Sequence, residues 1–549
     1  GGDQLFFMQG DLWGSGTAPA NVHAHNATYT GTILYAFSSN PSPNWTASCG
    51  ATGSQQSNLP PGVECFSMAP TSASDWGKYN GSLAAATQRD WIIRIDNTAS
   101  WTPYLSCTDY NAMGNSWVSA PILPIIVAPF VAGRWRGSTN TDWFECKNWD
   151  DVQVPLATTD VTIEPQYVSQ NCVVGLAGPI GLNPGGIGVC ASVSMLGTGT
   201  DANRSLTVAN GSTLNVGGPV NVQRTAGTGF LSIAMQATAA FNATSLSLSS
   251  VVPTGSTFSN TNVTSQASFS SDVTLGVGGA IILTNGNLDI GGDWVNLESE
   301  AQFLDVGSRV RFNGAGPQTI TIATGDEYFS TLGLNKSAGS LTLNNPVQVR
   351  TTLDLTSGRV NTSNPAGLLT LGAGGTSVNA TVASFVNGPM QKIGNTNYFF
   401  PVGKGNFLRP CGVTGYGADW VGSGIIAEYF PISAYTWGIP SEPTINHLSQ
   451  CEYWTIDRSA GAASPVVQLT WLAPNSCGVT LLTDLRVARW DNAASIWRDR
   501  GNGGATGTTG PTASGTIPTA AIQTLFNASP GPTPWTLASI TSENPLPIS

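Results

Sequence analysis

Short apolar triplets recur through residues 134–385 and limit the folds open to this chain more than any other feature. In each triplet two apolar residues flank a polar one, which is typical of a short strand with one buried face. Gly, Asn and Ser separate the triplets, and no helical period runs through them. The pattern predicts an all-β region that is either a β-solenoid or a series of stacked β-sandwiches, and we favour a solenoid-like or elongated stack. Examples are residues 206–208, 214–216, 273–275, 288–290, 341–343 and 353–355.

Charged residues are scarce throughout the sequence. They make up 10% of the 549 residues, against about 25% in an ordinary soluble domain. The low content of Glu, Lys and Arg argues against a helix-rich enzyme, while 41% hydrophobic residues supply enough material for cores. A net charge of −11 argues against a nucleic-acid partner, because a phosphate backbone requires a clustered basic face.

The most apolar stretch, residues 120–133, is interrupted by proline and too short to cross a bilayer. We therefore expect no membrane span. The N-terminus shows no basic segment followed by an apolar one, so we interpret the sequence as a mature chain after processing.

Changes in composition predict three domains. Residues 1–133 are rich in turn signals and contain short alternating runs such as residues 90–95, which predicts a loop-rich β-domain. Residues 134–385 form the repetitive short-strand region. Residues 386–549 have longer apolar runs and more aromatic residues, which predicts a β-sandwich.

Nine cysteines are spread along the chain without a CxxC motif or a Cys/His cluster, so we do not expect a zinc site. Their distribution favours an oxidising compartment. The sequence leaves the connectivity open, and the odd number implies one free or intermolecular thiol. The pairs closest in sequence are Cys49 and Cys65, Cys172 and Cys190, and Cys451 and Cys477.

Several motifs resemble those of large secreted surface proteins of Bacteroidota. The first opens the middle region, the second lies within it, the third begins near its end, and a short N-P-L-P motif closes the chain. The residues that carry the resemblance are Trp135, Gly137, Trp143, Asn148, Trp149, Val154, Pro155, Asp160 and Ile163; Phe312, Gly314, Gly316, Gln318, Ile320, Asn335, Lys336, Leu341 and Leu343; Gly388, Pro389, Phe400, Gly403, Gly405, Arg409 and Pro410; and Asn544, Leu546 and Pro547.

The resemblance implies secretion through the outer membrane by the type IX route, and an adhesive or structural role at the cell surface. It carries over no catalytic residues. The N-P-L-P motif is similar to the linker that precedes a type IX sorting domain, and we interpret the end of the chain as a product of processing. Residues 1–133 lie outside the resemblance.

The three histidines offer little for catalysis. His23 and His25 alternate along one predicted strand without a third metal ligand nearby, which favours a surface role. With only His447 elsewhere and no G-x-S-x-G motif, nucleophilic catalysis is not favoured.

Two groups of aspartates are candidates for chemistry on polysaccharides, which requires paired carboxylates or calcium ligands. One pair, Asp150 and Asp151, lies beside a predicted turn, and Asp289, Asp293 and Asp305 lie at the ends of predicted strands. We favour turn capping for both groups. Calcium at Asp150 and Asp151 is the functional alternative, and no other cofactor is expected.

The N-terminal run at residues 4–9 is uncharged and β-prone, and includes Leu5, Phe6, Phe7 and Met8. One interpretation is a strand paired within the chain. The other is a donor strand, within residues 3–13, that completes the sheet of a neighbouring subunit and so builds a homopolymer.

These features lead to two functional hypotheses. The first is a secreted, non-enzymatic structural subunit of an extracellular filament or adhesive surface structure, which self-associates and contacts glycans or cell surfaces. The alternative is a carbohydrate-binding surface protein, whose exposed aromatic rings would stack on sugars, or a β-helical polysaccharide-degrading enzyme.

Overall fold

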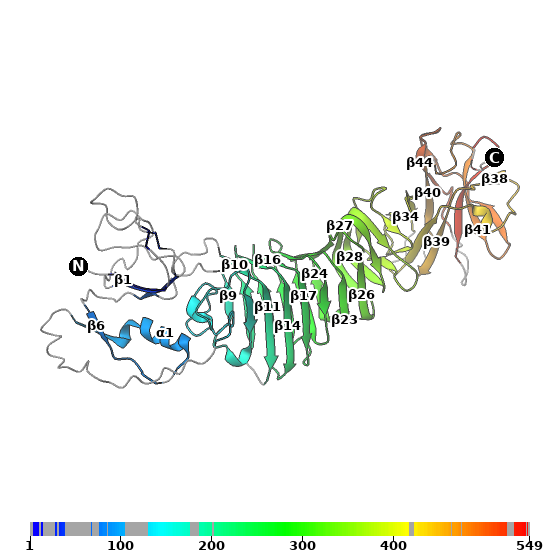
Figure 1. Ribbon diagram of the computed structural model, residues 1–549. Helices are drawn as coiled ribbons and strands as arrows, with labels where there is room; N and C mark the ends of the chain where they lie inside the picture. Colours follow the sequence, from blue (N-terminus) through cyan, green and yellow to red (C-terminus); the bar gives the residue numbers. More distant parts are fainter. Residues whose placement is uncertain are drawn as a thin grey trace. The chain divides into compact units, whose positions relative to one another are not determined.

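The structure of the 549-residue chain is a computed structural model (Figure 1). The chain divides into two compact units, Gly1–Val193 and Ser194–Ser549. Among the residues described, no helix is long and apolar enough to span a bilayer. The structure describes residues 4–9, 13–14, 28–29, 32–38, 67–68, 76–84, 86–104, 130–175, 186–199, 203–416, 422–462, 464–473, 475–523, 532–544 and 546.

The first unit begins with small sheets. A three-stranded sheet has the order β1-β4-β5, and β2 with β3 and β6 with β7 form two-stranded antiparallel pairs. One helix, α1, lies between β6 and β7 in the sequence. The bounds are β1 (Gln4–Gln9), β2 (Trp13–Gly14), β3 (Thr28–Tyr29), β4 (Thr32–Ser38), β5 (Ser67–Met68), β6 (Trp76–Tyr79), α1 (Gln88–Asp96) and β7 (Trp101–Tyr104).

Helix α1 corrects the prediction of an alternating strand at residues 90–95. The Thr87 side chain accepts the backbone N–H of Asp90, which caps the N-terminus of the helix. The Asp96 carboxylate at the other end forms an ion pair with Lys147 at 2.9 Å. Apolar residues within a run this short fit both a strand and a helix, and the cap and the tertiary contact favour the helix.

The rest of the first unit is built mainly of turns around three tryptophans. Trp135, Trp143 and Trp149 are fully buried, and their rings meet edge to face with centroids 5.0 and 4.9 Å apart. The elements are η3 (Cys146–Asn148), β8 (Asp160–Ile163), η4 (Pro165–Tyr167), β9 (Cys172–Val174) and β10 (Ile187–Cys190), followed by β11 (Ser192–Thr198) at the unit boundary.

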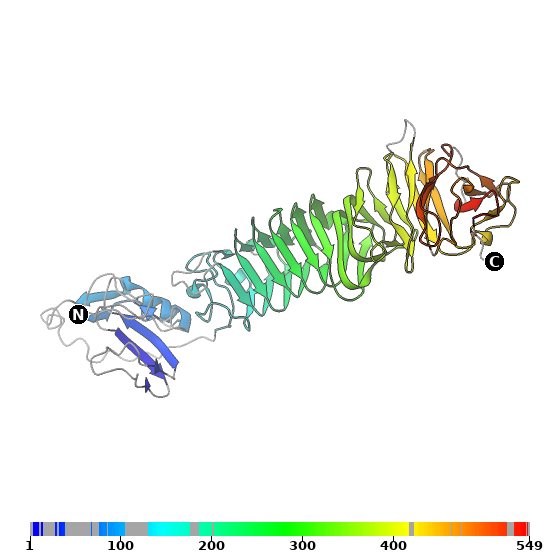
Figure 2. The same cartoon turned by 90° about the horizontal axis from the view of Figure 1, so that it is seen from above.

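The middle region folds as a β-solenoid of about 8 turns, whose stacked strands appear in green in Figures 1 and 2. Each early turn in the second unit supplies three short strands, and every strand pairs in parallel with its counterpart in the next turn. The strands are β12 (Arg204–Val208), β13 (Thr213–Val216), β14 (Pro219–Ala226), β15 (Leu231–Met235), β16 (Ala240–Ala243), β17 (Ser245–Ser250), β18 (Ser256–Asn260), β19 (Gln266–Phe269), β20 (Val273–Leu275), β21 (Gly279–Thr284), β22 (Asn287–Ile290), β23 (Trp294–Ser299), β24 (Phe303–Val306), β25 (Arg309–Phe312) and β26 (Gln318–Thr324).

The register stacks like residues upon one another in the interior. Leu206 pairs with Ile233, Ile233 with Phe258, Phe258 with Ile281, and Ile281 with Phe303. All five side chains are buried. This continuous column explains the apolar triplets, because each strand has one face in the core and needs only neighbouring turns to cover it.

Later turns use longer strands, and the solenoid then meets antiparallel structure. Strand β32 pairs antiparallel with β37 (Gly424–Phe430), which covers the edge of β32. The elements are β27 (Glu327–Leu343), β28 (Val347–Asn361), β29 (Leu369–Leu371), β30 (Thr376–Val378), β31 (Val386–Asn387), β32 (Met390–Ile393), β34 (Val402–Lys404) and β35 (Phe407–Leu408).

The C-terminal part consists of antiparallel strands. One five-stranded sheet has the order β33-β36-β40-β44-β43. The remaining strands belong to the large sheet that also contains solenoid strands, and in it β45 pairs antiparallel with β38, β39 and β41. The strands are β33 (Tyr398–Phe400), β36 (Cys411–Thr414), β37 (Gly424–Phe430), β38 (His447–Leu448), β39 (Tyr453–Ala460), β40 (Val466–Leu472), β41 (Leu485–Asp491), β42 (Ile496–Asp499), β43 (Thr506–Gly507), β44 (Ser514–Pro518) and β45 (Pro534–Ser539).

The predicted fold class is confirmed, because the chain is nearly all β with a solenoid in its middle region. The solenoid, rather than stacked sandwiches, accounts for the triplets. The domain boundaries at residues 133 and 385 stay predictions.

Candidate functional site

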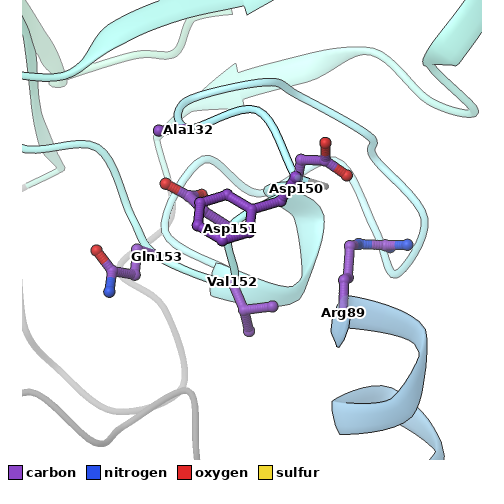
Figure 3. Close-up of a pocket in the computed structure, with 7 residues that line it drawn as sticks. Arg89, Ala132, Asp150, Asp151, Val152 and Gln153 are labelled. Carbon is purple, nitrogen blue, oxygen red and sulfur yellow. The ribbon is translucent and has the colours of Figure 1, made fainter. Parts of the chain in front are cut away.

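A pocket of about 240 Å³ lies in the first unit, beside the tryptophan cluster. Helix α1 contributes one lining residue, and the others come from the turns on either side of the tryptophans. Figure 3 shows Asp151 and Gln153 toward one side, and Asp150 and Arg89 toward the other. The lining residues are Arg89, Phe130, Ala132, Asp150, Asp151, Val152 and Gln153.

Asn148 fixes the turns that carry the pocket. Its side-chain oxygen accepts the backbone N–H groups of Thr139 and Asn140 at 3.0 and 3.2 Å. Its amide donates to the Asn140 side chain at 2.7 Å and to the Asp142 carbonyl at 2.9 Å. The side chain is fully buried and uses its whole hydrogen-bonding capacity. The Asn148-Trp149 motif therefore has a structural role, because it holds these turns together.

Asp150 is neutralised by arginines. Its Oδ1 accepts from Arg136 Nε at 2.9 Å, and Arg134 NH1 lies 3.8 Å from its Oδ2. The backbone N–H of Val131 donates to the same Oδ2 at 2.9 Å. Both arginines also lie over the Tyr167 ring, at 4.5 and 5.2 Å from its centroid. Asp150 thus stabilises this turn.

The Asp151 carboxylate has fewer hydrogen-bond partners than that of Asp150. The Gly133 N–H donates to its Oδ2 at 3.3 Å, while its buried Oδ1 has no hydrogen-bond partner of good geometry. Burial raises the pKa of the Asp151 carboxyl. The next residue, Val152, has a φ of 56°, which is a strained conformation for a β-branched residue. Strain of this kind often accompanies a functional site.

This geometry does not support calcium at Asp150 and Asp151. The arginines and a backbone N–H already occupy the Asp150 oxygens, whereas calcium takes six to eight oxygen ligands. Within the part of the chain that the structure describes, no group of three or more His, Cys, Asp or Glu side chains is placed to hold a metal ion.

The second group of aspartates does not converge. Asp289 lies on β22 and forms a bidentate ion pair with Arg311 of the next turn. Asp293 lies in the turn before β23, and Asp305 lies on β24 in a different sheet, where it accepts the Ser330 N–H. Each carboxylate therefore stabilises its own part of the solenoid. The turn-capping interpretation does not describe Asp289, which lies inside a strand and bonds to a side chain of the next strand.

Of the histidines, His447 is on β38, and its ring nitrogens lie 2.9 Å from the Asn446 side-chain oxygen and 2.8 Å from the Asn544 carbonyl. It links the chain's N-P-L-P motif to β38. His23 and His25 lie outside the described residues.

The second motif of the resemblance forms a solenoid corner. The Gln318 amide donates to the carbonyls of Ile290 and Gly292, and its oxygen accepts the Gly314 N–H at 3.0 Å. Lys336, one turn further on, donates to the Gly314 carbonyl at 2.9 Å and to Gln318. Burial lowers the pKa of Lys336 to about 8. The motif thus joins successive turns through side chain to backbone bonds.

Lys392 has a comparable role near the end of the solenoid. Its buried ammonium donates to three backbone carbonyls, Gly372, Ala373 and Ile393, each at 2.7 Å. Burial lowers its pKa to about 8. A perturbed lysine is a candidate catalytic group, but all three of its donors are used on the backbone.

The cysteines follow the prediction in part. Cys451 and Cys477 form a disulfide, which confirms that pair. Cys172 and Cys190 are free and buried in this structure, so the predicted second pair is not formed. Cys146 is disulfide-bonded. The candidate pair Cys49 and Cys65 lies outside the described residues.

The N-terminal run forms strand β1, as both interpretations require. Its backbone pairs antiparallel with β4 of the same chain, with Leu5 opposite Phe37, Phe6 opposite Ala36, Phe7 opposite Tyr35 and Met8 opposite Ile33. In the isolated chain the intrachain interpretation therefore holds. In the order β1-β4-β5, however, β1 is an edge strand.

Sequence reasoning singled out only Asp150 and Asp151 and missed the other five residues of the pocket, among them Arg89 and Phe130. Arg89 donates to the Lys147 carbonyl at 3.0 Å, and this contact joins α1 to the turns around the tryptophan cluster. The only signal in the sequence is the apolar character of the segment that ends near Phe130.

In comparisons with known proteins, the chain matches no protein family, no curated protein and no solved structure.

Proposed function

We propose that this protein is a secreted, non-enzymatic structural subunit of an extracellular filament or adhesive surface structure. The observation that carries the proposal is the use of buried charge in the second unit. Lys336 and Lys392 are bonded to backbone carbonyls of the solenoid, and Arg409 and Glu452 are bonded to each other. Enzymes use buried charged side chains of this kind in catalysis. In this protein these side chains hold turns and sheets in place.

Polar ladders on the solenoid support the same role. The Asn242 amide donates to Asn215 of the preceding turn at 2.9 Å, and the Asn387 amide donates to Asn361 at 2.8 Å. These bonds between side chains of successive turns add to the backbone pairing. A solenoid held together in this way, with few charges, suits a durable extracellular component.

Strand β1 supports self-association. Among the strands that the structure describes, it lies at the edge of its sheet, and an uncharged edge strand is a template for pairing with another chain. We propose that β1 leaves β4 and pairs with the β4 strand of a neighbouring subunit in the assembly. The proposal thus combines the intrachain pairing of the isolated chain with strand donation in the polymer.

Electron microscopy of the full chain tests this proposal. Filaments are expected from the wild type and not from a chain that lacks residues 1–14, while the second unit keeps its thermal unfolding transition. A synthetic peptide of residues 3–13 in excess should block assembly, because it occupies the acceptor strand, whereas a scrambled peptide should not. Filaments that persist after the deletion would show that strand donation is wrong.

Glycan binding is the second candidate function, and the pocket beside the tryptophan cluster favours it. The degrading-enzyme version is less well supported, since the candidate carboxylates Asp289, Asp293 and Asp305 are bonded separately. A glycan array probed with the intact chain, together with a reducing-sugar assay, separates binding from cleavage.

A further inference from the structure

We propose that the pocket beside the tryptophan cluster binds a single neutral sugar unit of a glycan. The sugar's C–H face packs on the Phe130 ring, and its hydroxyl groups bond to Asp151 and Gln153. The inference rests on the adhesive role proposed above and supplies its ligand class. It does not depend on assembly through β1.

The size of the pocket sets the size of the ligand. Pockets for drug-sized molecules measure roughly 300–1,000 Å³. A volume of about 240 Å³ suits a smaller body, such as one pyranose ring whose linkages continue into solvent. The lining combines apolar and polar groups, as a sugar with one apolar face requires.

The charges around the pocket point to a neutral ligand. Asp150 is already bonded to arginine. Arg89 donates to Asp90 at 3.1 Å, to the Lys147 carbonyl at 3.0 Å and to the Ser138 hydroxyl, so each nitrogen of its guanidinium already has an acceptor and its charge is paired with Asp90. The pocket therefore offers no free cation to an anionic ligand. The Asp151 carboxyl remains to bond to sugar hydroxyl groups, and burial raises the pKa of this carboxyl.

Two features supply the contacts that a sugar needs. Phe130 is 52% exposed although it borders the pocket, and a large exposed ring offers apolar area to a ligand. Asp151 is a half-buried carboxyl that lines the pocket, and Gln153 is exposed, with an amide that both donates and accepts. Val152, whose φ of 56° is strained for a β-branched residue, lies between these two polar residues in the sequence.

Ligand-observed NMR and calorimetry on the intact chain test the inference. The probes are methyl β-D-glucopyranoside, methyl α-D-mannopyranoside, methyl β-D-galactopyranoside and N-acetyl-D-glucosamine. At least one of them should bind saturably at millimolar concentration. Phe130→Ala should raise its Kd by about tenfold or more, and Asp151→Asn should also weaken binding.

Phe230→Ala is the matched control, because Phe230 is 47% exposed but lies on the solenoid. It should bind the probe as the wild type does. Thermal unfolding checks that each variant is folded. The proposal is overturned if none of the probes binds, or if folded Phe130→Ala binds as tightly as the wild type.

The same variants separate this inference from assembly. Phe130→Ala and Asp151→Asn should form filaments as the wild type does, since neither residue belongs to β1 or β4. Normal filaments without sugar binding would refute the pocket alone, whereas sugar binding by a chain that never assembles would refute the filament alone.

Discussion

Arg409 Nε donates to Glu452 Oε2 at 2.9 Å, and the two side chains are 1% and 0% exposed. Arg409 also donates to the Leu472 carbonyl at 2.7 Å, and the Tyr429 hydroxyl donates to Glu452 at 3.0 Å. Burial raises the pKa of Glu452, and the arginine opposes this shift. The arginine of the third motif thus joins the segment before β36 to the segment before β39, next to the Cys451–Cys477 disulfide.

Removing one member of this pair should destabilise the C-terminal sheets strongly. Arg409→Met leaves an uncompensated buried carboxylate and should lower the free energy of unfolding by about 3–5 kcal/mol. Replacing both partners with Met should recover much of that loss, because the buried charges then disappear together. Denaturant unfolding followed by tryptophan fluorescence measures the effect.

The partly exposed pair of Lys404 and Glu428 provides the control. Lys404 is 41% exposed, so Lys404→Met should cost no more than about 1 kcal/mol. Equal losses for Lys404→Met and Arg409→Met would contradict a special role for the buried pair.

Two glycines of the second motif should respond differently to substitution. A Cβ at Gly314 would lie 2.0 Å from the Gly291 carbonyl oxygen, whereas a Cβ at Gly316 would meet no atom within 4 Å. Gly314→Ala should therefore destabilise the solenoid by about 1–3 kcal/mol, as overpacking does. Gly316→Ala should be neutral or slightly stabilising. Thermal unfolding of the two variants, side by side, decides the matter; equal melting temperatures would exclude the close approach.

The sequence predicted those parts of the fold in which local pattern and tertiary burial agree. The triplet at residues 206–208 lies within β12 and the one at 288–290 within β22, because a strand buried on one face shows this alternation directly. Helix α1 was mispredicted because its alternation covers only six residues. Its helical form depends on the Thr87 cap and on the contact of Asp96 with Lys147.

The pocket could not be predicted from the sequence, for a different reason. Arg89 reaches the module that carries Asp150 only through the tertiary contact of α1, and no spacing in the sequence marks it. The pair Asp150 and Asp151 was singled out, but the partners that decide the role of each carboxylate are arginine side chains and backbone amides brought close by folding.

Glu327 should make the solenoid sensitive to pH. Its Oε2 accepts from Trp294 at 2.8 Å and from Asn296 at 3.0 Å, while its buried Oε1 has no partner. Burial raises its pKa from 4.5 to about 7, and nearby Glu300 adds to the shift. Since the folded state holds this proton more tightly than the unfolded state, its contribution to stability is full below pH 4.5 and is lost as the pH rises to about 7.

Glu327→Gln should remove this dependence, which is on the order of 3 kcal/mol across the interval. The difference in unfolding free energy between variant and wild type, measured from pH 4 to 8, should grow in favour of the variant as the pH rises. Glu543→Gln, at an exposed position, should follow the wild type throughout. A constant difference for Glu327→Gln would show that the carboxyl does not titrate in this range.

Thiol labelling should separate the cysteines by state and by burial. Cys172, Cys190 and Cys411 are buried and free, and burial raises the pKa of Cys190 to about 12 and that of the other two as well. Because the thiolate is the reactive form, iodoacetamide at pH 8 should leave all three unlabelled in the folded protein and modify them after denaturation without reductant. Cys451 and Cys477 should react only after reduction. A Cys172–Cys190 crosslink in the mass spectrum of the non-reduced digest would contradict the free thiols.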